Sequence, residues 1–425
     1  MVGIGPLITI PLVLAALHGP LSLVAWTLGA LVAACDGMVW AELGAALPRA
    51  GGLYAFFLQL FGQRVGRFLA FLFVWQFVIT TPFLLASGYI GFSQYATYIW
   101  PALRGNDTAQ HVLAVCVGIV TIVLLARVIV HVARISIALF ATVCITLAIV
   151  TLASWTHFDA HAAFALPANP LGLGSFIAGL GTGLTITLYD YLGYNTVTSI
   201  GEEIVTPHRT IPRSIGGAIL IVAAFYIALQ TGVLGSLSSN APTPESARFI
   251  ASTVVQNAWG AGFAGVATIL ILITAFASTF ALLLAASRVP FAAARDGLFL
   301  PAFGRLHARD AYPHVSLTII GLLALVFCFL PLDQIIAVIG VGIVVVGGVG
   351  AIASMLKLRR SDRAMPYRMP LFPLPPLVAL AAWIYVLMTA GLFAVLFTAL
   401  SLGAGTLIYR YSLSKTAASA GIETS

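Results

Sequence analysis

Long apolar runs recur along the whole chain, and polar residues are confined to the short intervals between them. A run of about 20 apolar residues can cross the hydrocarbon core of a bilayer as one helix. The runs are continuous rather than alternating residue by residue, which excludes a transmembrane β-barrel. The pattern predicts an all-α polytopic membrane protein with twelve spans, the first of them truncated. The runs lie near 2–17, 20–46, 67–97, 109–127, 132–153, 173–200, 214–236, 261–287, 314–331, 333–356, 374–390 and 392–409.

No interval between the runs is long enough to hold a soluble domain. We therefore expect a single membrane domain over residues 1–410 and a short tail over 411–425. Composition agrees, because 60% of the 425 residues are hydrophobic and only 8% are charged, whereas about a quarter of the residues of a soluble protein are charged. The mean hydropathy is +1.06.

The net charge of +7 indicates topology rather than nucleic-acid binding. With twelve spans and a cytoplasmic N-terminus, the loops after even-numbered spans and the C-terminus face the cytoplasm. These parts hold every basic residue except Arg104 and Arg248, as the positive-inside rule requires. The sequence thus predicts a multi-pass protein with its N-terminus, even-numbered loops and C-terminus in the cytoplasm.

The cysteines and histidines indicate no metal site or disulfide. Cys35, Cys116, Cys144 and Cys328 all fall inside predicted helices, where we interpret them as small buried hydrophobic residues. The eight histidines form no HExxH motif or i, i+4 pair. We expect no metal and no cofactor.

Two of the twelve segments carry helix-breaking residues. The first opens with two glycines and two prolines between Val2 and Pro11, and the sixth contains Tyr-Asp-Tyr-Leu-Gly at 189–193. First and sixth are corresponding places in two halves of five helices, which predicts an inverted 5 + 5 repeat. Repeat 1 then covers about 1–153 and repeat 2 about 173–356, with two extra helices at 374–409.

A broken helix at the centre of the membrane leaves backbone groups that need a polar ligand. Freed N–H groups and the positive end of a half-helix suit a carboxylate, whereas freed carbonyls suit an ammonium. An amino-acid zwitterion supplies both groups. Other glycines, such as the GxxxG pair Gly179 and Gly183, are interpreted as packing residues.

Four stretches resemble the amino acid–polyamine–organocation superfamily, and within it bacterial amino acid permeases related to L-type transporters. They are GIGPLITIP at 3–11, AELGAALPRAGGLYAF at 41–56, YDYLGYN with GEEIVTPHRTIPRSI at 201–215, and SRVPFAAARDGLFLPAFGRLH at 287–307. The resemblance implies a LeuT-type fold of ten core helices plus two. It also implies a secondary active permease, not an enzyme, that moves amino acids across the inner cell membrane by alternating access.

A polyamine or cationic amine carrier, or an amino acid exchanger, remains the alternative. The expected partners are an amino acid, the lipid bilayer and a possible coupling proton, but no nucleic acid. A channel would need repeated rings of carbonyls or charges, and a membrane enzyme would need a nucleophile–base pair or a metal set. Neither pattern is visible in the sequence.

The resemblance also implies roles for individual residues. Gly3, Ile4 and Gly5 align with a loop that binds the substrate carboxylate, and Tyr189 aligns with an aromatic gate. Leu192 and Gly193 lie in the unwound stretch whose carbonyls receive the amino group, and Asn195 matches a polar residue near the substrate. A lysine that several members carry in segment five is replaced within Ala138–Cys144, so coupling through that lysine is not expected.

The first segment lacks the cytoplasmic half that the resemblance predicts before Gly3. We therefore expect that Met1 is not the true start, and that about 10–20 further residues complete the span.

The buried acids leave several roles open. Asp190 either holds the ammonium, orients the unwound backbone or takes a coupling proton, or else it caps the second half-helix. Glu42 is predicted to pair with a basic residue at an inner gate, and Asp36 remains ambiguous between gating and coupling. Glu202 and Glu203, followed by Arg209 and Arg213, form a predicted acid–base cluster at that gate. Residues 288–309 and 51–62 are predicted to form interfacial helices.

Overall fold

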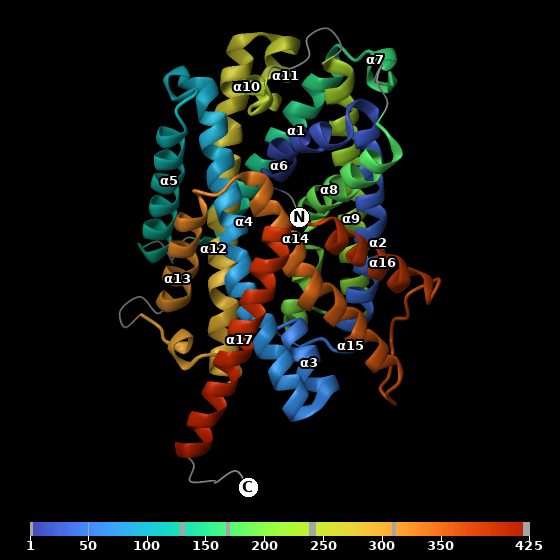
Figure 1. Cartoon of the computed structure of the whole chain (residues 1–425), viewed down its shortest axis with the longest axis vertical. Coiled ribbons are helices and arrows are strands. Elements are labelled where there is room, and N and C mark those ends of the chain that lie inside the picture. The colour runs from blue at the N-terminus through green and yellow to red at the C-terminus, as the bar shows by residue number, and fades with distance from the viewer. Residues whose placement is uncertain are drawn as a thin grey trace.

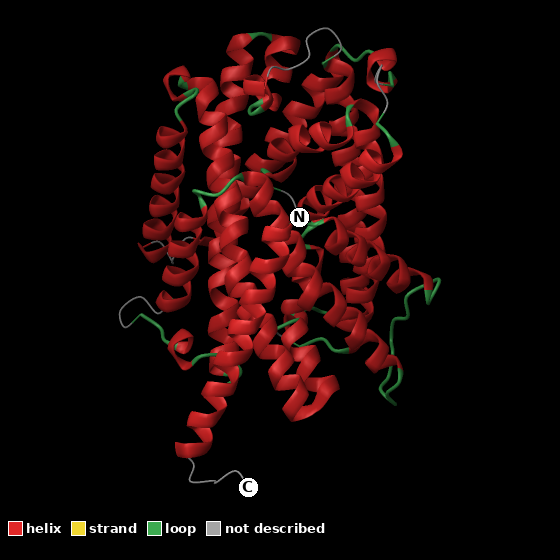
Figure 2. Ribbon diagram, viewed as in Figure 1, coloured by secondary structure: helices red, strands yellow, loops and turns green. Residues whose placement is uncertain are grey.

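The computed structural model describes residues 3–49, 51–127, 132–166, 171–237, 244–307 and 312–419, and every regular element within these ranges is helical (Figure 2). The longer helices are α1 (Gly5–Leu17), α2 (Ser22–Ala46), α4 (Arg67–Ile99), α5 (Asp107–Arg127), α6 (Val132–Thr156), α8 (Leu173–Tyr191), α9 (Pro207–Ser236), α12 (Ala261–Arg295), α13 (His314–Phe327), α14 (Leu332–Ile343), α15 (Val349–Arg359), α16 (Leu374–Thr389) and α17 (Leu392–Ser419). Short helices are α3 (Leu53–Phe61), α7 (Ala160–Phe164), α10 (Pro244–Ala247) and α11 (Ile250–Trp259).

Eight helical stretches in the described ranges are long and apolar enough to cross a membrane, which confirms an integral membrane protein. They are Gly19–Ala46, Leu53–Ile99, Asp107–Ala126, Leu139–Thr156, Pro207–Ser236, Ala261–Arg295, Leu332–Arg359 and Leu392–Tyr411. Three shorter apolar helices, α1, α13 and α16, accompany them. Between α14 and α15 the π-helical turn Val344–Gly348 interrupts the regular α-helical hydrogen bonds, but the helical stretch Leu332–Arg359 continues through it.

The sequence predicted most helix positions but missed others. The interfacial helix predicted for 288–309 is wrong, because α12 continues through Arg295 and is followed by a turn and a 3-10 turn at Pro301–Gly304; residues 308–311 lie outside the described ranges. Helices α10 and α11 were not predicted, because they lie in the interval between two predicted spans, where no long apolar run marks a helix. The predicted tail at 411–425 begins as a continuation of α17, which runs to Ser419. Cys116 and Cys144 are exposed rather than buried.

Packing at the centre of the bundle depends on small residues. Helix α2 lies against α8 and α9, and α4 lies against α12, α13 and α14. An added Cβ at Gly37 of α2 would lie 2.6 Å from Ile219 and 3.0 Å from Ile215, both on α9. Close approach of helix backbones is how membrane helices gain contact without a hydrophobic driving force.

The two ends of the bundle differ in structure and charge. One end carries α3, the end of α15 and the C-terminus, whereas the other carries α7, α10 and α11 (Figure 1). Arg104 and Arg248 form exposed ion pairs at the α10–α11 end, to Glu245 and Asp107 respectively, each at 3.7 Å. Arg359 is the last residue of α15, and Arg363 lies beyond it and donates to Gln59 of α3.

Gly232 tests the close packing of α9 on α6. An added Cβ would meet Ser154 Oγ and lie 2.8 Å from Trp155 Nε1. We expect Gly232→Ala to destabilise the protein by about 1–3 kcal/mol, the usual range for an overfilled site. The control is Gly216→Ala on the same helix, where no atom lies within 4 Å. Thermal unfolding in detergent should show a lower Tm for Gly232→Ala alone, and equal Tm values would contradict this packing.

Candidate functional site

Helix α8 breaks directly after Tyr191. Leu192 has φ −57° and ψ 149°, and Gly193 has φ 104° in the left-handed region, which glycine adopts without strain. A 3-10 segment, Tyr194–Ser199, follows. The break therefore lies at Leu192–Gly193, and Tyr189 and Asp190 are still helical.

The position of Asp190 rules out one of its predicted roles. It lies at the C-terminal end of α8 rather than at the start of a following helix, and the segment after the break has Gly193 as its N-cap. The capping role predicted for Asp190 is therefore wrong. Its carboxylate instead faces α1, where Thr9 Oγ1 donates a hydrogen bond of 2.6 Å to Oδ2.

The start of α1 meets the end of α8. Helix α1 begins at Gly5 with proline in its first turn, and Gly3 and Ile4 precede it in a bend. A Cβ added at Gly5 would collide with Asp190 Oδ1 and lie 3.5 Å from Tyr189 Cε1. The two segments that the sequence predicted to be broken thus touch each other, and glycine at position 5 is what permits the approach.

One oxygen of Asp190 is not satisfied by the described residues. Oδ1 is buried and has no hydrogen-bond partner, and the residue is 4% exposed. No ion pair joins Asp190 to a basic side chain in the described ranges. A buried polar atom without a partner is unfavourable by about 1–3 kcal/mol, so a native oxygen in this state points to a ligand donor.

Side chains from α4 and α12 complete the surroundings. The Tyr189 hydroxyl is 2.8 Å from Ser87 Oγ on α4, which fixes the ring beside Gly5. A Cβ added at Gly3 would lie 3.0 Å from Ser278 Oγ on α12. Ile4 is 3% exposed and contributes an apolar wall.

Tyr95 is a site residue that the sequence did not reveal. Pro11 has no backbone N–H, so the Leu7 carbonyl one turn earlier loses its helical partner. The Tyr95 hydroxyl of α4 donates to this carbonyl at 2.7 Å, and Ala251 N–H of α11 lies 3.4 Å from the same hydroxyl. Pro11 in an apolar helix signals an orphaned carbonyl, but it does not identify the donor.

Other predicted site residues lie outside this contact. Leu192 and Gly193 follow Asp190 directly and are half-buried. Asn195 is half-buried in the 3-10 segment, and its side chain makes no hydrogen bond to the described residues. These three residues follow the α1–α8 contact in the sequence but are not part of it.

Glu42 has the basic partner that the sequence led us to expect. Arg359 at the end of α15 donates Nε to Oε1 at 2.5 Å and Nη2 to Oε2 at 2.6 Å, and Met369 N–H donates to Oε2 at 2.7 Å. The guanidinium carbon lies 3.8 Å from the centre of the Phe372 ring. This buried bidentate pair ties α2 to α15 and to the loop that leads into α16.

Asp36 lies six residues earlier on α2 and is 2% exposed. Tyr194, the first residue after Gly193, donates its hydroxyl to Oδ2 at 2.6 Å. Trp383 of α16 lies 3.4 Å from Oδ1 through its indole nitrogen. Asp36 thus contacts the segment that follows the break in α8.

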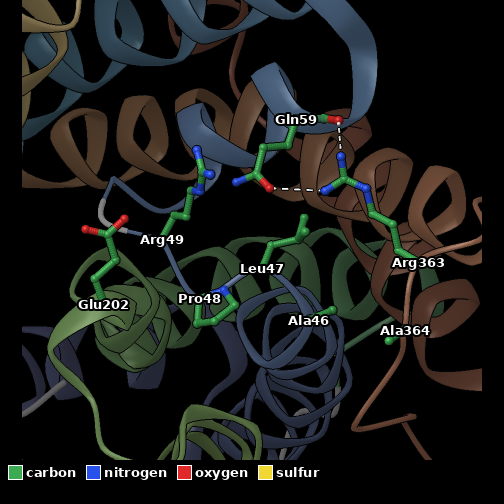
Figure 3. A pocket seen from close by; sticks show the side chains of 8 residues that line it. All are labelled: Ala46, Leu47, Pro48, Arg49, Gln59, Glu202, Arg363 and Ala364. Atoms are coloured by element: carbon green, nitrogen blue, oxygen red, sulfur yellow. Dashed lines mark hydrogen bonds between the residues drawn. The ribbon is translucent and has the colours of Figure 1, made fainter.

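The predicted acid–base cluster is not an ion-paired network. Glu202, Glu203, Arg209 and Arg213 are exposed, and no salt bridge joins them in the described ranges. Glu202 instead lines an open pocket of about 560 Å³ with Arg49, Gln59 and Arg363 (Figure 3). Arg363 donates to the side-chain and backbone oxygens of Gln59, both at 3.1 Å.

That pocket is wide, but it contains none of the residues around Asp190. The α1–α8 contact is closed, with Ile4, Thr9 and Asp190 all buried. We place the candidate site there because a buried polar atom without a partner indicates a bound ligand more directly than open volume does. Among the described residues, no group of three or more His, Cys, Asp or Glu side chains is arranged to hold a metal.

Comparisons with known proteins agree along almost the whole chain. The family model described as "Amino acid permease" matches residues 1–411. The branched-chain amino acid permease BcaP of Lactococcus lactis is 24% identical, over 93% of this chain and 88% of its own. The serine/threonine exchanger SteT of Bacillus subtilis is 25% identical, over 86% and 82% respectively. A methylthioribose transporter of Bacillus subtilis is 24% identical, over 96% and 89%.

The Glu42–Arg359 pair should contribute far more to stability than an exposed pair. Glu42→Gln leaves a largely buried guanidinium without its counter-charge, and we expect a loss of about 3–5 kcal/mol. The matched control is Glu245→Gln, which removes the exposed partner of Arg104 and should change stability by no more than about 1 kcal/mol. Thermal unfolding in detergent compares the two, and similar Tm values for both variants would show that the buried pair is not a structural tie.

Proposed function

This chain belongs to the amino acid permease family, and we propose that it is a secondary transporter that carries amino acids across the cell membrane by alternating access. The observation that carries this proposal is the contact between the start of α1 and the end of α8. At this contact the buried Asp190 Oδ1 faces Gly5 and has no hydrogen-bond partner among the described residues.

The two helix ends are complementary to a zwitterion. The first N–H groups of α1 have no partners within the helix and carry its positive dipole end, so Gly3, Ile4 and Gly5 offer a site for a carboxylate. The last carbonyls of α8 carry the negative end, and Asp190 adds a full charge beside them. An α-amino acid between these ends places each charged group against its opposite.

The roles of individual residues follow from this placement. Asp190 accepts the substrate ammonium through Oδ1, while Thr9 holds Oδ2. Tyr189, held by Ser87, covers the substrate as an aromatic gate. Leu192 and Gly193 supply carbonyls from the unwound stretch, and Asn195 supplies a polar group when the segment moves.

We infer a 5 + 5 inverted repeat from the packing of corresponding segments. The first four segments of one half each contact their counterpart in the other: α1 with α8, α2 with α9, α4 with α12 and α5 with α13. Pairing of equivalent elements is what a two-fold axis through the bundle produces. This arrangement favours twelve spans, with α16 and α17 outside the repeat.

The short helices support the inversion. Helix α3 follows the second segment and α11 follows the seventh, and they lie at opposite ends of the bundle (Figure 1). Each ends at a glycine in the left-handed region, Gly62 with φ 73° and Gly260 with φ 89°. A repeated motif at opposite ends is expected if the second half is turned over relative to the first.

The distribution of basic residues supports a cytoplasmic location for the α3–α15 end. There the Glu42–Arg359 pair closes α2 against α15. We assign Glu202, Glu203 and Arg209, which form no ion pair among the described residues, to the mouth of the inner gate. We propose that the Glu42–Arg359 pair must break before the substrate can be released to the cytoplasm.

An amine carrier and an amino acid exchanger are the alternatives. A free carboxylate oxygen also suits a polyamine, which has no carboxylate for the α1 end. A relative named for methylthioribose shows that related chains carry substrates without an amino acid backbone. Counterflow in proteoliposomes with labelled leucine, serine, lysine and putrescine separates these cases. We expect exchange of amino acids and none of putrescine, whereas exchange of putrescine alone would reject the zwitterion site.

Gly5→Val places a branched side chain where Asp190 Oδ1 lies. We expect the apparent affinity for amino acids to fall by about 10- to 100-fold, corresponding to about 1–3 kcal/mol of overpacking at the site. Gly262→Val on α12, where no atom lies within 4 Å, is the control for folding and membrane insertion. Normal counterflow by a folded Gly5→Val protein would show that the substrate binds elsewhere.

Asp190→Asn keeps the shape but removes the charge. A charge-assisted hydrogen bond contributes about 1 kcal/mol more than a neutral one, so the KM for amino acids should rise several-fold while thermal stability is unchanged or improved. A fall in maximal rate at unchanged KM would instead assign Asp190 an orienting role. Unaltered transport in this variant would remove Asp190 from the site.

A further inference from the structure

The three buried acids of the bundle have different surroundings. Glu42 is neutralised by Arg359. Asp190 lies at the proposed substrate site with one oxygen unpartnered. Asp36 has no cationic partner among the described residues and no place in the proposed substrate contact, although it is 2% exposed in an apolar helix. An ionisable side chain within a membrane is expensive to bury and is retained for function.

Asp36 accepts hydrogen bonds from donors on two other elements, and Trp40 of its own helix is a third donor. Tyr194 donates to Oδ2 at 2.6 Å, a distance typical of an O–H donor on an ionised carboxylate. Trp383 Nε1 lies 3.4 Å from Oδ1. Tyr194 directly follows the left-handed Gly193, so its hydroxyl anchors the segment beyond the break to α2.

The neighbouring elements supply no counter-charge. Around Asp36, α9 presents Ile215 and Ile219 against Gly37, and α16 presents the Trp383 indole, which has no acid–base function here. On α2 itself the neighbouring titratable group is the Cys35 thiol, which interacts with Asp36 electrostatically.

The buried titratable groups named below, on other helices that touch α2, are bonded to other partners, whereas Lys357 of α15 and Arg209 and Arg213 of α9 are exposed. On α8, Asp190 is bonded to Thr9 of α1, and the Tyr191 hydroxyl donates to the Trp26 carbonyl. On α15, Arg359 is bound by Glu42, six residues beyond Asp36. Tyr385 of α16 donates to the Ile177 carbonyl. Tyr194 is therefore the one titratable side chain in the described ranges that hydrogen-bonds to Asp36.

We propose that Asp36 carries a proton together with the amino acid, and that Tyr194 transmits its protonation to the segment beyond the break in α8. This inference rests on the proposed transport function and adds the coupling ion and its site. Cys144 and its neighbours contain no basic residue that could serve instead, since 138–144 reads ALFATVC.

The step balances in protons and charge. A proton enters from one side and forms an O–H bond with a carboxylate oxygen of Asp36, which becomes neutral. The Tyr194 bond is then neutral rather than charge-assisted, and charge-assisted bonds are about twice as strong. The segment beyond Gly193 is thereby released from α2 and can move with the loaded substrate. On the other side the O–H bond breaks, the same proton leaves, and the carboxylate holds Tyr194 again.

Trp383 gives α16 a part in this step. A Cβ added at Gly348 would lie 2.6 Å from Trp383 Nε1, so the indole is wedged between the π-helical turn Val344–Gly348 and Asp36. One oxygen of Asp36 thus faces a fixed donor on α16, and the other faces a donor on the segment that moves.

The test uses the full chain in proteoliposomes with a pH-sensitive dye inside and L-serine or L-leucine, whichever exchanges faster, as the substrate. With an acidic exterior the wild type should take up protons together with the amino acid, and should accumulate it up to about tenfold per pH unit if coupling is one to one. Asp36→Asn should still exchange amino acids in counterflow, because exchange needs no net proton movement. It should neither accumulate substrate against a gradient nor admit protons.

Two further variants keep the test decisive. Tyr194→Phe removes the donor that favours the carboxylate, so Asp36 should bind its proton at a higher pH. The alkaline limb of the uptake profile should then move to higher pH. Cys35→Ala on the same helix removes the other titratable neighbour and should leave accumulation and its pH profile as in the wild type.

Several results would overturn the proposal. Net uptake of the amino acid by the wild type without proton entry would reject proton coupling while leaving amino acid transport intact. Accumulation by Asp36→Asn equal to that of the wild type would move the proton site elsewhere. If Asp36→Asn fails to fold, an unchanged pH profile in Tyr194→Phe is the result that rejects it. A wild type without counterflow of any amino acid would reject the proposed function and this inference with it.

Discussion

The contact on which the rest of the structure depends joins two helix ends rather than two helix sides. Helix α1 begins at Gly5 and α8 ends at Tyr191, and the start of α1 lies against Asp190 near the end of α8. Inside a membrane, backbone groups at a helix end have no water to bond to. Such helix ends are stable only where protein or ligand groups hydrogen-bond to their free N–H and C=O groups. The contact between the two ends is therefore a polar site within an apolar bundle. Glycine at position 5 and proline at 6 and 11 are the sequence features that produce it.

Around the α1–α8 contact, a few buried hydrogen bonds and one ion pair fix the positions of neighbouring helices relative to one another. Tyr95 replaces the N–H that Pro11 lacks and so fixes the first turns of α1 against α4. Thr9 and Ser87 orient Asp190 and Tyr189. Glu42 and Asp36, both on α2, reach respectively to α15 and to the segment beyond the break. Helix α2 thus contacts the parts that would move in transport while it remains packed against α9.

Sequence reasoning located the elements well because hydrophobic run length is a strong signal in membrane proteins. It also placed the break of α8 within two residues, since Gly193 in an apolar run marks a left-handed position. The sequence-based predictions failed where a residue's role depends on contacts with distant parts of the chain. A capping role was one of the alternatives that the sequence left open for Asp190, but its Oδ2 accepts a hydrogen bond from Thr9 on another helix. Arg288 and Arg295 suggested a separate amphipathic helix, yet the intervening Val-Pro-Phe-Ala-Ala-Ala continues α12. The partner of Tyr95 is 88 residues away in the chain, which no local pattern encodes.

The central claim is that an amino acid binds between the start of α1 and Asp190, and a structure of the complex tests it most directly. The account predicts that the carboxylate lies at the N–H groups of Gly3–Gly5, and that the ammonium nitrogen lies about 2.7–3.2 Å from Asp190 Oδ1. A bound amino acid found instead in the pocket of Arg49, Glu202 and Arg363, with Asp190 still bonded to Thr9 alone, would contradict it.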